Sequence, residues 1–282
     1  MQTACAKVNL WLNVVGRRAD GYHLLDSLVA FVDLVDTVEA RHSDRLSLEV
    51  TGPGSAALAG EGDNLVLKAA RLLAERAAVP PLAALSLVKR IPVAAGLGGG
   101  SADAAATLRA LVDLWRLALP EDALFEIAGA LGADVPMCLA GRTALATGIG
   151  DHLHPAPALP SAAILLVNPG VALPTREVFA ARRGPFSPAR TVQPCWRGMA
   201  ELVAALAGRG NDLTDAAISL RPVIAEVLAF LRQRDGARYA AMSGSGATCF
   251  ALFDTIVAAR RAANSVPDKW WCHTGAFVSP PA

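Results

Sequence analysis

Aromatic residues are scarce in this sequence and make up only 5% of its 282 residues. The hydrophobic fraction is 53%, but much of it is alanine and the apolar runs are short. The run from Ala162 to Val167 ends at Asn168, well below the roughly 20 residues that a membrane-spanning helix requires. Lys7 and Asn9 interrupt the first apolar stretch, which does not resemble a signal peptide. We therefore expect a helix-rich cytoplasmic protein with a substantial core.

Paired cysteines and blocks of like charge are also missing. The five cysteines are scattered without a C-x-x-C pair, so the sequence supports neither a disulfide framework nor a zinc site, and we expect reduced packing residues. The formal net charge is only +1, and no cluster of Lys and Arg is present that could gather nucleic acid. The expected partner is therefore a small molecule, with no nucleic acid or membrane involved, and we expect a monomer or weak homodimer.

The first half of the chain has the pattern of a mixed sheet interrupted by helices. Alternating or valine-rich stretches predict strands, and leucines at helical spacing predict a helix over residues 64–77. The expected strands lie at residues 5–15, 27–38, 46–50 and 84–88.

Prolines are concentrated near the middle of the chain. Pro155, Pro157 and Pro160 follow Gly150 closely, which is typical of a link between domains. We therefore predict an N-terminal domain at 1–154 and a C-terminal domain at 155–282. The second half is expected to contain a strand at 163–167, helices near 198–207, 213–219 and 223–233, and a hairpin at 243–247.

A glycine-rich segment between a predicted strand and a predicted helix is the strongest signal for chemistry. Consecutive glycines let backbone N–H groups wrap around an anion, and the positive end of the following helix adds to the attraction. This segment therefore predicts a phosphate-binding loop. Its residues are Pro92, Val93, Ala94, Ala95, Gly96, Leu97, Gly98, Gly99, Gly100, Ser101 and Ala102.

Two common phosphate-binding loops do not fit this segment. The Walker A loop ends in Gly-Lys-Ser/Thr, but no lysine is present here, and the dinucleotide fingerprint requires glycine where Ser101 stands. A nicotinamide-dependent dehydrogenase is thereby excluded. A flexible turn without function is the alternative, which the context between strand and helix disfavours.

Three motifs, in order along the chain, resemble those of the GHMP kinases, such as galactokinase, homoserine kinase and mevalonate kinase. Residues 6–10 resemble the first motif, 92–102 the second and 242–247 the third. The resemblance implies a two-domain α+β fold, with a mixed-sheet N-terminal domain, a ferredoxin-like C-terminal domain and the active site between them. It also implies ATP as the phosphoryl donor, with Mg²⁺ bridging its β- and γ-phosphates.

Other segments look like one branch of this family, the diphosphocytidyl-methylerythritol kinases. These segments are residues 16–23, 131–136, 148–150 and 174–175. That branch phosphorylates the 2-hydroxyl of its cytidyl substrate in the non-mevalonate route to isoprenoid precursors. The resemblance implies that cytosine is held between the rings of Tyr22 and Phe179 and hydrogen-bonded by His23, for which an ordinary turn histidine is the alternative. Further substrate contacts are implied at Asn9, Ile149, Pro174, Thr175 and Gly244.

Lys7 and Asp134 are the candidate catalytic residues. A lysine in an apolar strand is costly to bury unless it is paired, and a carboxylate is the natural partner. The resemblance implies that Asp134 is the base and that Lys7 orients it and lowers the pKa of the acceptor hydroxyl. Without the motifs, Asp134 would be interpreted as a helix N-cap before Pro136.

The sequence identifies no acidic magnesium ligand. Ser101 is a candidate neighbour of the ion, whereas Asp103, in the first turn of the predicted helix, is explained equally well by the helix dipole. Asn64 and Lys89 correspond to positions near the adenine pocket of the family.

Two other functions are open alternatives. Another GHMP kinase would act on mevalonate-like, homoserine-like or sugar substrates, which the pair Tyr22 and His23 argues against. A nucleotide-binding regulator would have lost catalysis, which the presence of both Lys7 and Asp134 argues against. The segment from Ala181 to Trp196 has little that resembles the family.

Overall fold

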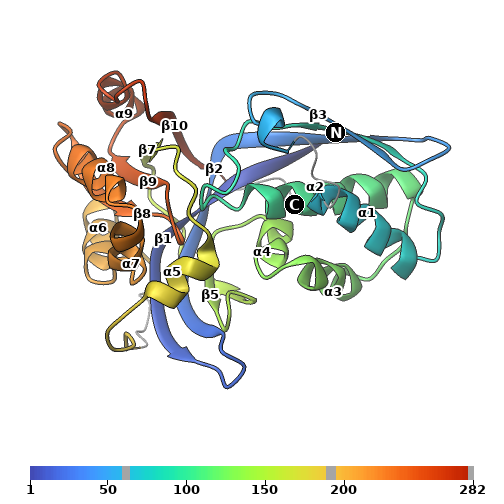
Figure 1. Cartoon of the computed structure of the whole chain (residues 1–282), viewed down its shortest axis with the longest axis horizontal. Helices are drawn as coiled ribbons and strands as arrows, with labels where there is room; N and C mark the ends of the chain where they lie inside the picture. Colours follow the sequence, from blue (N-terminus) through green and yellow to red (C-terminus); the bar gives the residue numbers. More distant parts are fainter. Residues whose placement is uncertain (59–63, 189–194, 279–282) are drawn as a thin grey trace.

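Two long antiparallel strands run through the centre of the molecule (Figure 1). The structure is a computed structural model that describes residues 1–58, 64–188 and 195–278. The strands are β1 (Gln2–Arg17) and β2 (His23–Arg41), which pair from Gln2 with Val38 to Arg17 with His23. Most of β1 is buried, which agrees with its mostly apolar sequence, and the polar Lys7, Asn9 and Asn13 are buried with it.

The N-terminal half places its helices on one side of this hairpin (Figure 1). Strand β4 pairs with β2 in antiparallel and with β3 in parallel orientation, so the sheet is mixed as predicted. The elements are β3 (Ser47–Thr51), the 3-10 helix η1 (Ser55–Leu58), α1 (Leu65–Arg76), β4 (Ala84–Val88), α2 (Gly99–Trp115), α3 (Glu121–Leu131), α4 (Val135–Ala140), β5 (Ala144–Thr147) and β6 (His152–Pro155).

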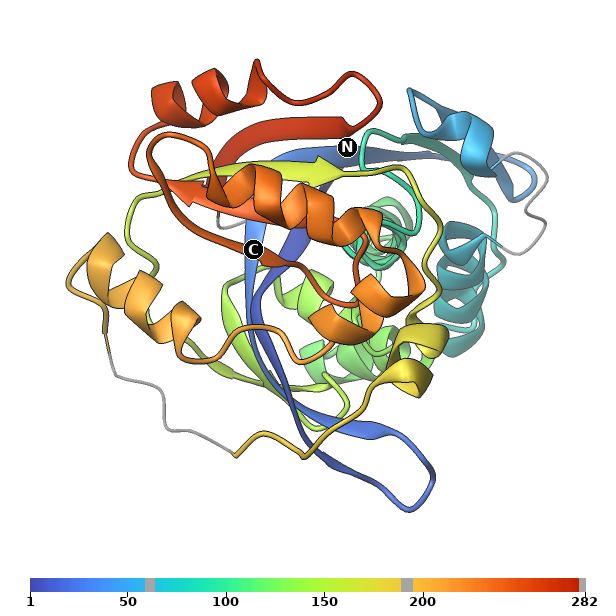
Figure 2. The same cartoon turned by 60° about the vertical axis from the view of Figure 1, so that its left-hand side comes forward.

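The C-terminal half has the predicted ferredoxin-like layout. Its four strands are antiparallel neighbours in the order β10-β7-β9-β8, with α8 packed on β8 and β9 (Figure 2). The elements are β7 (Ala163–Asn168), α5 (Thr175–Ala181), α6 (Met199–Ala207), α7 (Thr214–Leu220), α8 (Val223–Arg232), β8 (Ala237–Met242), β9 (Cys249–Phe253), α9 (Ile256–Ala263) and β10 (Trp271–Val278).

The two halves share a sheet and part of a core. Strand β10 pairs with β7 along its length and with β2 at Phe277 and Val278. One buried cluster combines Trp11 of β1 with Leu166 of β7 and Phe250 of β9. The boundary after residue 154, at the end of β6, stays a prediction.

Two expectations from composition can be compared with the structure. All five cysteines are free thiols, and Cys5, Cys138 and Cys249 are buried, but Cys195 is exposed, so a packing role is wrong for that residue. Among the described residues, none of the helices combines the length and apolar character of a membrane span.

Candidate active site

A cleft of about 1490 Å³ brings the three sequence motifs together. It is lined by residues of β1, of the segment between β4 and α2, of the start of α4 and of the turn between β8 and β9. Both predicted catalytic residues and all predicted substrate-binding residues line this cleft. Of the predicted phosphate loop, only Leu97 and Ala102 do not line it, because their side chains are buried in the core.

The glycine-rich loop approaches neighbouring segments too closely for larger residues. Gly98 has φ +64°, and a Cβ atom there would lie 2.6 Å from Cγ of Lys7. Gly96 has φ +75°, and its Cβ would lie 2.6 Å from the carbonyl oxygen of Gly246. Helix α2 begins directly after, at Gly99, so the free N–H groups of its first turn are available at the cleft. This geometry suits a phosphate group.

The turn between β8 and β9 holds the loop from the opposite side. The Thr248 hydroxyl donates to the carbonyl oxygen of Ala95 at 2.6 Å, and the Ser243 hydroxyl donates to that of Gly96 at 3.2 Å. Asn211, which the sequence analysis did not single out, donates from its amide to the carbonyl oxygens of Met242 and Gly244, both at 2.8 Å. The second and third motifs therefore form one hydrogen-bonded unit.

Lys7 and Asp134 meet in the cleft as predicted. The Lys7 ammonium lies 3.4 Å from Oδ2 of Asp134 and donates to Oδ1 of Asn9 at 2.7 Å. The Asn9 amide in turn donates to the Ser27 hydroxyl at 2.8 Å. Asp134 occupies the N-cap position of α4, but its side chain makes no capping hydrogen bond. The alternative that it serves only as a helix cap is therefore not supported.

The predicted cytidyl-binding rings lie at another part of the same cleft. The rings of His23 and Phe179 are stacked, with centroids 5.0 Å apart, while Tyr22 is 61% exposed. Burial lowers the pKa of His23, and the nearby guanidinium groups of Arg17 and Arg182 lower it further. The neutral imidazole is favoured, and it can both donate and accept a hydrogen bond.

The other predicted substrate residues line the same cleft. The Thr175 hydroxyl forms a 2.8 Å hydrogen bond with that of Ser245, which joins the start of α5 to the third motif. Ile149, Pro174 and Gly244 also line the cleft, together with Tyr22 and Phe179.

Lys89 lines the cleft, and its side chain binds two protein carboxylates. Its ammonium is buried between carboxylate oxygens of Asp36 at 2.5 Å and Asp103 at 2.6 Å. The other oxygen of Asp36 accepts hydrogen bonds from the backbone N–H groups of Arg90 and Ile91. Lys89 thus connects β2, the end of β4 and α2 around the base of the phosphate loop.

Asp103 belongs to this ion-pair cluster. Burial raises the pKa of Asp103 to about 7, the charge of Lys89 opposes this shift, and the charge of Asp36 adds to it. Oδ1 of Asp103 is buried without a hydrogen-bond partner in the described part of the chain. Asn64, the other predicted adenine neighbour, caps α1 by accepting from the backbone N–H of Val66 at 2.8 Å.

Ser101 is the predicted neighbour of a magnesium ion, and its position fits that prediction. It lies in the first turn of α2 and lines the cleft. Within residues 1–58, 64–188 and 195–278, no group of three His, Cys, Asp or Glu side chains is placed to hold a metal.

Comparisons with known proteins agree with this site. The model of the GHMP kinases N terminal domain matches residues 64–142, and that of the GHMP kinases C terminal domain matches residues 192–270. The 4-diphosphocytidyl-2-C-methyl-D-erythritol kinase of Rhodospirillum rubrum is 51% identical over 99% of this chain and 92% of its own length. That of Paramagnetospirillum magneticum is 52% identical over 98% of each chain.

A solved structure supports the same assignment. The crystal structure of a 4-(cytidine 5'-diphospho)-2C-methyl-D-erythritol kinase matches with a TM-score of 0.79 and 36% identity, and the match covers 99% of both chains. Sequence and fold therefore agree over nearly the whole length. This chain belongs to the GHMP kinases and, within them, to the family of 4-diphosphocytidyl-2-C-methyl-D-erythritol kinases.

Proposed function

We propose that this protein transfers the γ-phosphoryl group of ATP to the 2-hydroxyl of 4-diphosphocytidyl-2-C-methyl-D-erythritol in the non-mevalonate route to isoprenoid precursors. The observation that carries the proposal is the Lys7–Asp134 pair, which lies in the same cleft as the glycine-rich loop and the stacked rings of His23 and Phe179. A donor, an acceptor and a catalytic pair can thus be accommodated in one site.

Each part of the cleft has a distinct task in this reaction. The loop at residues 92–102 and the first turn of α2 bind the triphosphate through backbone N–H groups. Asp134 accepts the proton of the acceptor hydroxyl, since its carboxylate is open to the cleft, and Lys7 orients that carboxylate and stabilises the developing alkoxide. Tyr22, His23 and Phe179 bind the cytosine.

The magnesium ion is also part of the proposal. Its charge would offset that of the β- and γ-phosphates during transfer, with the Ser101 hydroxyl as the protein group nearest to it. Lys89 and Asn64 stabilise the segments around the ATP site, because the side chain of each binds a protein group, Asp36 for Lys89 and the backbone N–H of Val66 for Asn64. The domain boundary after residue 154, a cytoplasmic location and a monomer or weak homodimer stay predictions.

A coupled ADP-release assay tests the proposed reaction. The protein is supplied with ATP and Mg²⁺ and with diphosphocytidyl-methylerythritol, mevalonate, homoserine or galactose at equal concentration. We expect turnover with the cytidyl substrate alone. Turnover with another acceptor would support a kinase activity but contradict the assignment of the cytidyl pocket. ATP binding without any turnover would favour a nucleotide-binding regulator.

A further inference from the structure

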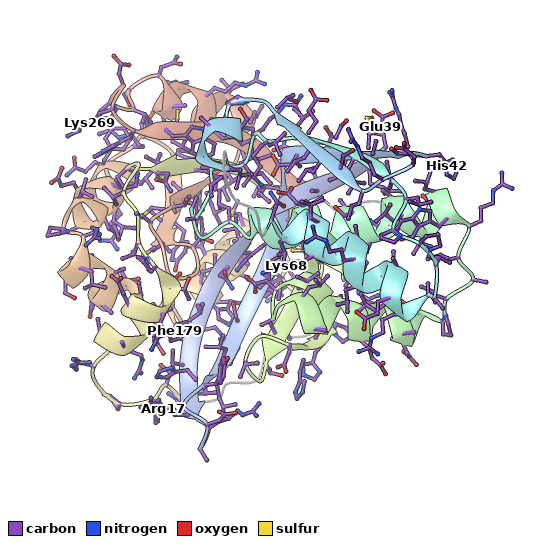
Figure 3. The ribbon with its side chains drawn as sticks, turned by 45° about the vertical axis from the view of Figure 1, so that its right-hand side comes forward. Arg17, Glu39, His42, Lys68, Phe179 and Lys269 are labelled. Carbon is purple, nitrogen blue, oxygen red and sulfur yellow. The ribbon has the colours of Figure 1, made fainter. Side chains whose placement is uncertain are left out.

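The cleft is rich in arginine at the end where His23 and Phe179 stack. Arg17, Arg176, Arg182 and Arg183 all line it. Figure 3 shows Arg17 at the end of the central hairpin and Phe179 on α5 at the same end of the molecule. The predicted substrate contacts included none of these arginines. Arg182 and Arg183 lie in the segment from Ala181 to Trp196, which has little that resembles the family, whereas Arg17 lies in the family-like segment 16–23 but was not singled out.

None of these four guanidinium groups forms an ion pair with Asp or Glu within the described ranges. Arg17 donates to the carbonyl oxygen of Gly21, and Arg182 donates to those of Gly184 and Pro185. By contrast, Arg18, which does not line the cleft, is paired with Asp20 at 2.8 Å. The four cleft arginines therefore have no carboxylate partner in the described part of the chain, whereas Asp20, which also lines the cleft, is paired with Arg18.

Arg17 and Arg182 approach the ring pair from two different elements. Arg17 is the partner of His23 in the last pair of the β1–β2 ladder, so both side chains lie on the same face of the hairpin. Arg182 directly follows α5, the helix that carries Phe179. Its Nε is buried and has no hydrogen-bond partner within the described residues, so one donor is unused.

The effect of both arginines on His23 supports this arrangement. After burial, the charges of Arg17 and Arg182 are the causes that lower the pKa of His23. Two like charges close to one imidazole create a positive potential, and a bound anion would relieve their mutual repulsion. Guanidinium groups bind phosphate oxygens with paired, charge-assisted hydrogen bonds.

We infer that Arg17 and Arg182 form an anion subsite that binds the diphosphate of the cytidyl substrate beside the His23–Phe179 ring pair. This inference rests on the proposed function, which supplies the cytidine diphosphate group. It makes the two arginines specificity determinants, since they would distinguish a diphosphocytidyl compound from an uncharged nucleoside with the same base.

Binding of cytidine, CMP and CDP tests this subsite by calorimetry, with the ATP site saturated by a non-hydrolysable ATP analogue. We expect the native protein to bind CDP at least about tenfold more tightly than cytidine. In Arg17→Gln and Arg182→Gln, CDP affinity should fall roughly tenfold while cytidine affinity changes less than about twofold. The KM for the full substrate should rise with little change in kcat.

Arg238→Gln is the matched control, because it removes an exposed guanidinium that is paired with Asp254 at 3.0 Å, and neither of these two residues lines the cleft. It should leave the CDP-to-cytidine ratio unchanged. An equal loss of cytidine and CDP affinity in the Arg17 and Arg182 variants, or no loss of either, would overturn the subsite alone. A native protein that binds the ATP analogue but neither CDP nor cytidine would overturn the proposed function as well.

Discussion

Asp134 and Lys7 differ in their access to solvent, and this difference separates their roles. The Asp134 side chain is 41% exposed and that of Lys7 is 8% exposed. A substrate hydroxyl can reach the carboxylate, whereas the ammonium is held in place by Asn9. We therefore expect Asp134 to contact the acceptor directly and Lys7 to act on both the carboxylate and the developing charge.

Replacing the Asp134 carboxylate tests the base role. In Asp134→Asn we expect kcat to fall by about 100-fold or more, because the amide cannot accept the proton, while the KM for ATP changes less than about twofold. Steady-state kinetics with both substrates measure this. Turnover near the native rate would remove Asp134 from the catalytic residues.

Lys7→Ala should lower kcat more than it weakens ATP binding. The ammonium is needed when negative charge develops on the acceptor oxygen, so its loss raises the barrier rather than the dissociation constant of ATP. Comparison of kcat with the Kd for ATP, from calorimetry, separates the two effects. A loss confined to ATP affinity would assign Lys7 to the donor site.

Among single residues, those that lie in short sequence motifs can be predicted from the sequence. Lys7 and Asp134 could be paired because each lies in a recognisable segment, and the structure confirms their contact. Asn211 and Asp36 lie outside the motifs and act through contacts distant in sequence, namely with the turn after β8 and with Lys89. A local sequence pattern does not predict contacts between residues that are distant in the sequence.

Among the elements, the base of the phosphate loop depends on a single buried ion-pair cluster. Lys89, just before the loop, and Asp103, just after it, are joined to each other and to Asp36 of β2. From the sequence, the helix dipole explained Asp103 as well as a role near magnesium did, but its side chain binds Lys89 and is almost fully buried. Helical periodicity did not reveal this because residues 102–108 are all buried, so no exposed face interrupts this part of α2.

The cluster predicts a specific pH dependence of stability. The pKa of Asp103 rises from 3.8 to about 7 on folding, so the folded state binds a proton that the unfolded state releases. The stability contributed by the protonated Asp103 carboxyl is complete below the pKa of the unfolded state and is lost as pH rises through about 7. Asp103→Asn, which cannot ionise, should therefore gain stability relative to the native protein as pH increases from about 4 to 8.

Urea unfolding at several pH values measures this difference in free energy. Asp113→Asn is the control on the same helix, since that exposed carboxylate contacts only the Gln2 amide among the described hydrogen bonds. As pH rises, Asp103→Asn should gain more stability relative to the native protein than Asp113→Asn does. A difference from the native protein that is constant with pH for Asp103→Asn would contradict the raised pKa of Asp103.

For the whole molecule, the sequence predicted a mixed-sheet N-terminal half and a ferredoxin-like C-terminal half, but not how the two halves are joined. The strand at residues 271–278 was not predicted, and it completes the C-terminal sheet and also pairs with β2. Its sequence mixes polar and apolar residues without clean alternation, and all of its residues except the buried Gly275 are half-buried, so no period-2 pattern marks the strand. The link between the halves is therefore a property of the tertiary structure.

This shared sheet predicts that the two halves unfold together. Trp11, Leu166 and Phe250 belong to one buried cluster drawn from both halves, so opening either half would expose core of the other. We expect one calorimetric transition in the absence of nucleotide, with the van't Hoff enthalpy equal to the calorimetric enthalpy.

Tryptophan fluorescence can compare the two halves during the same unfolding. Trp115 lies at the end of α2, and Trp270 is buried in the core of the C-terminal half. Because the chain has five tryptophans, two variants are needed that each keep one, Trp115 or Trp270, with the other four replaced by Phe. Each variant then reports on one half and should unfold with a fluorescence midpoint equal to its own far-UV circular dichroism midpoint. An ATP analogue should raise both midpoints together, because it binds only the folded cleft. Separate midpoints, with only one raised by nucleotide, would instead show two independent domains divided near residue 154.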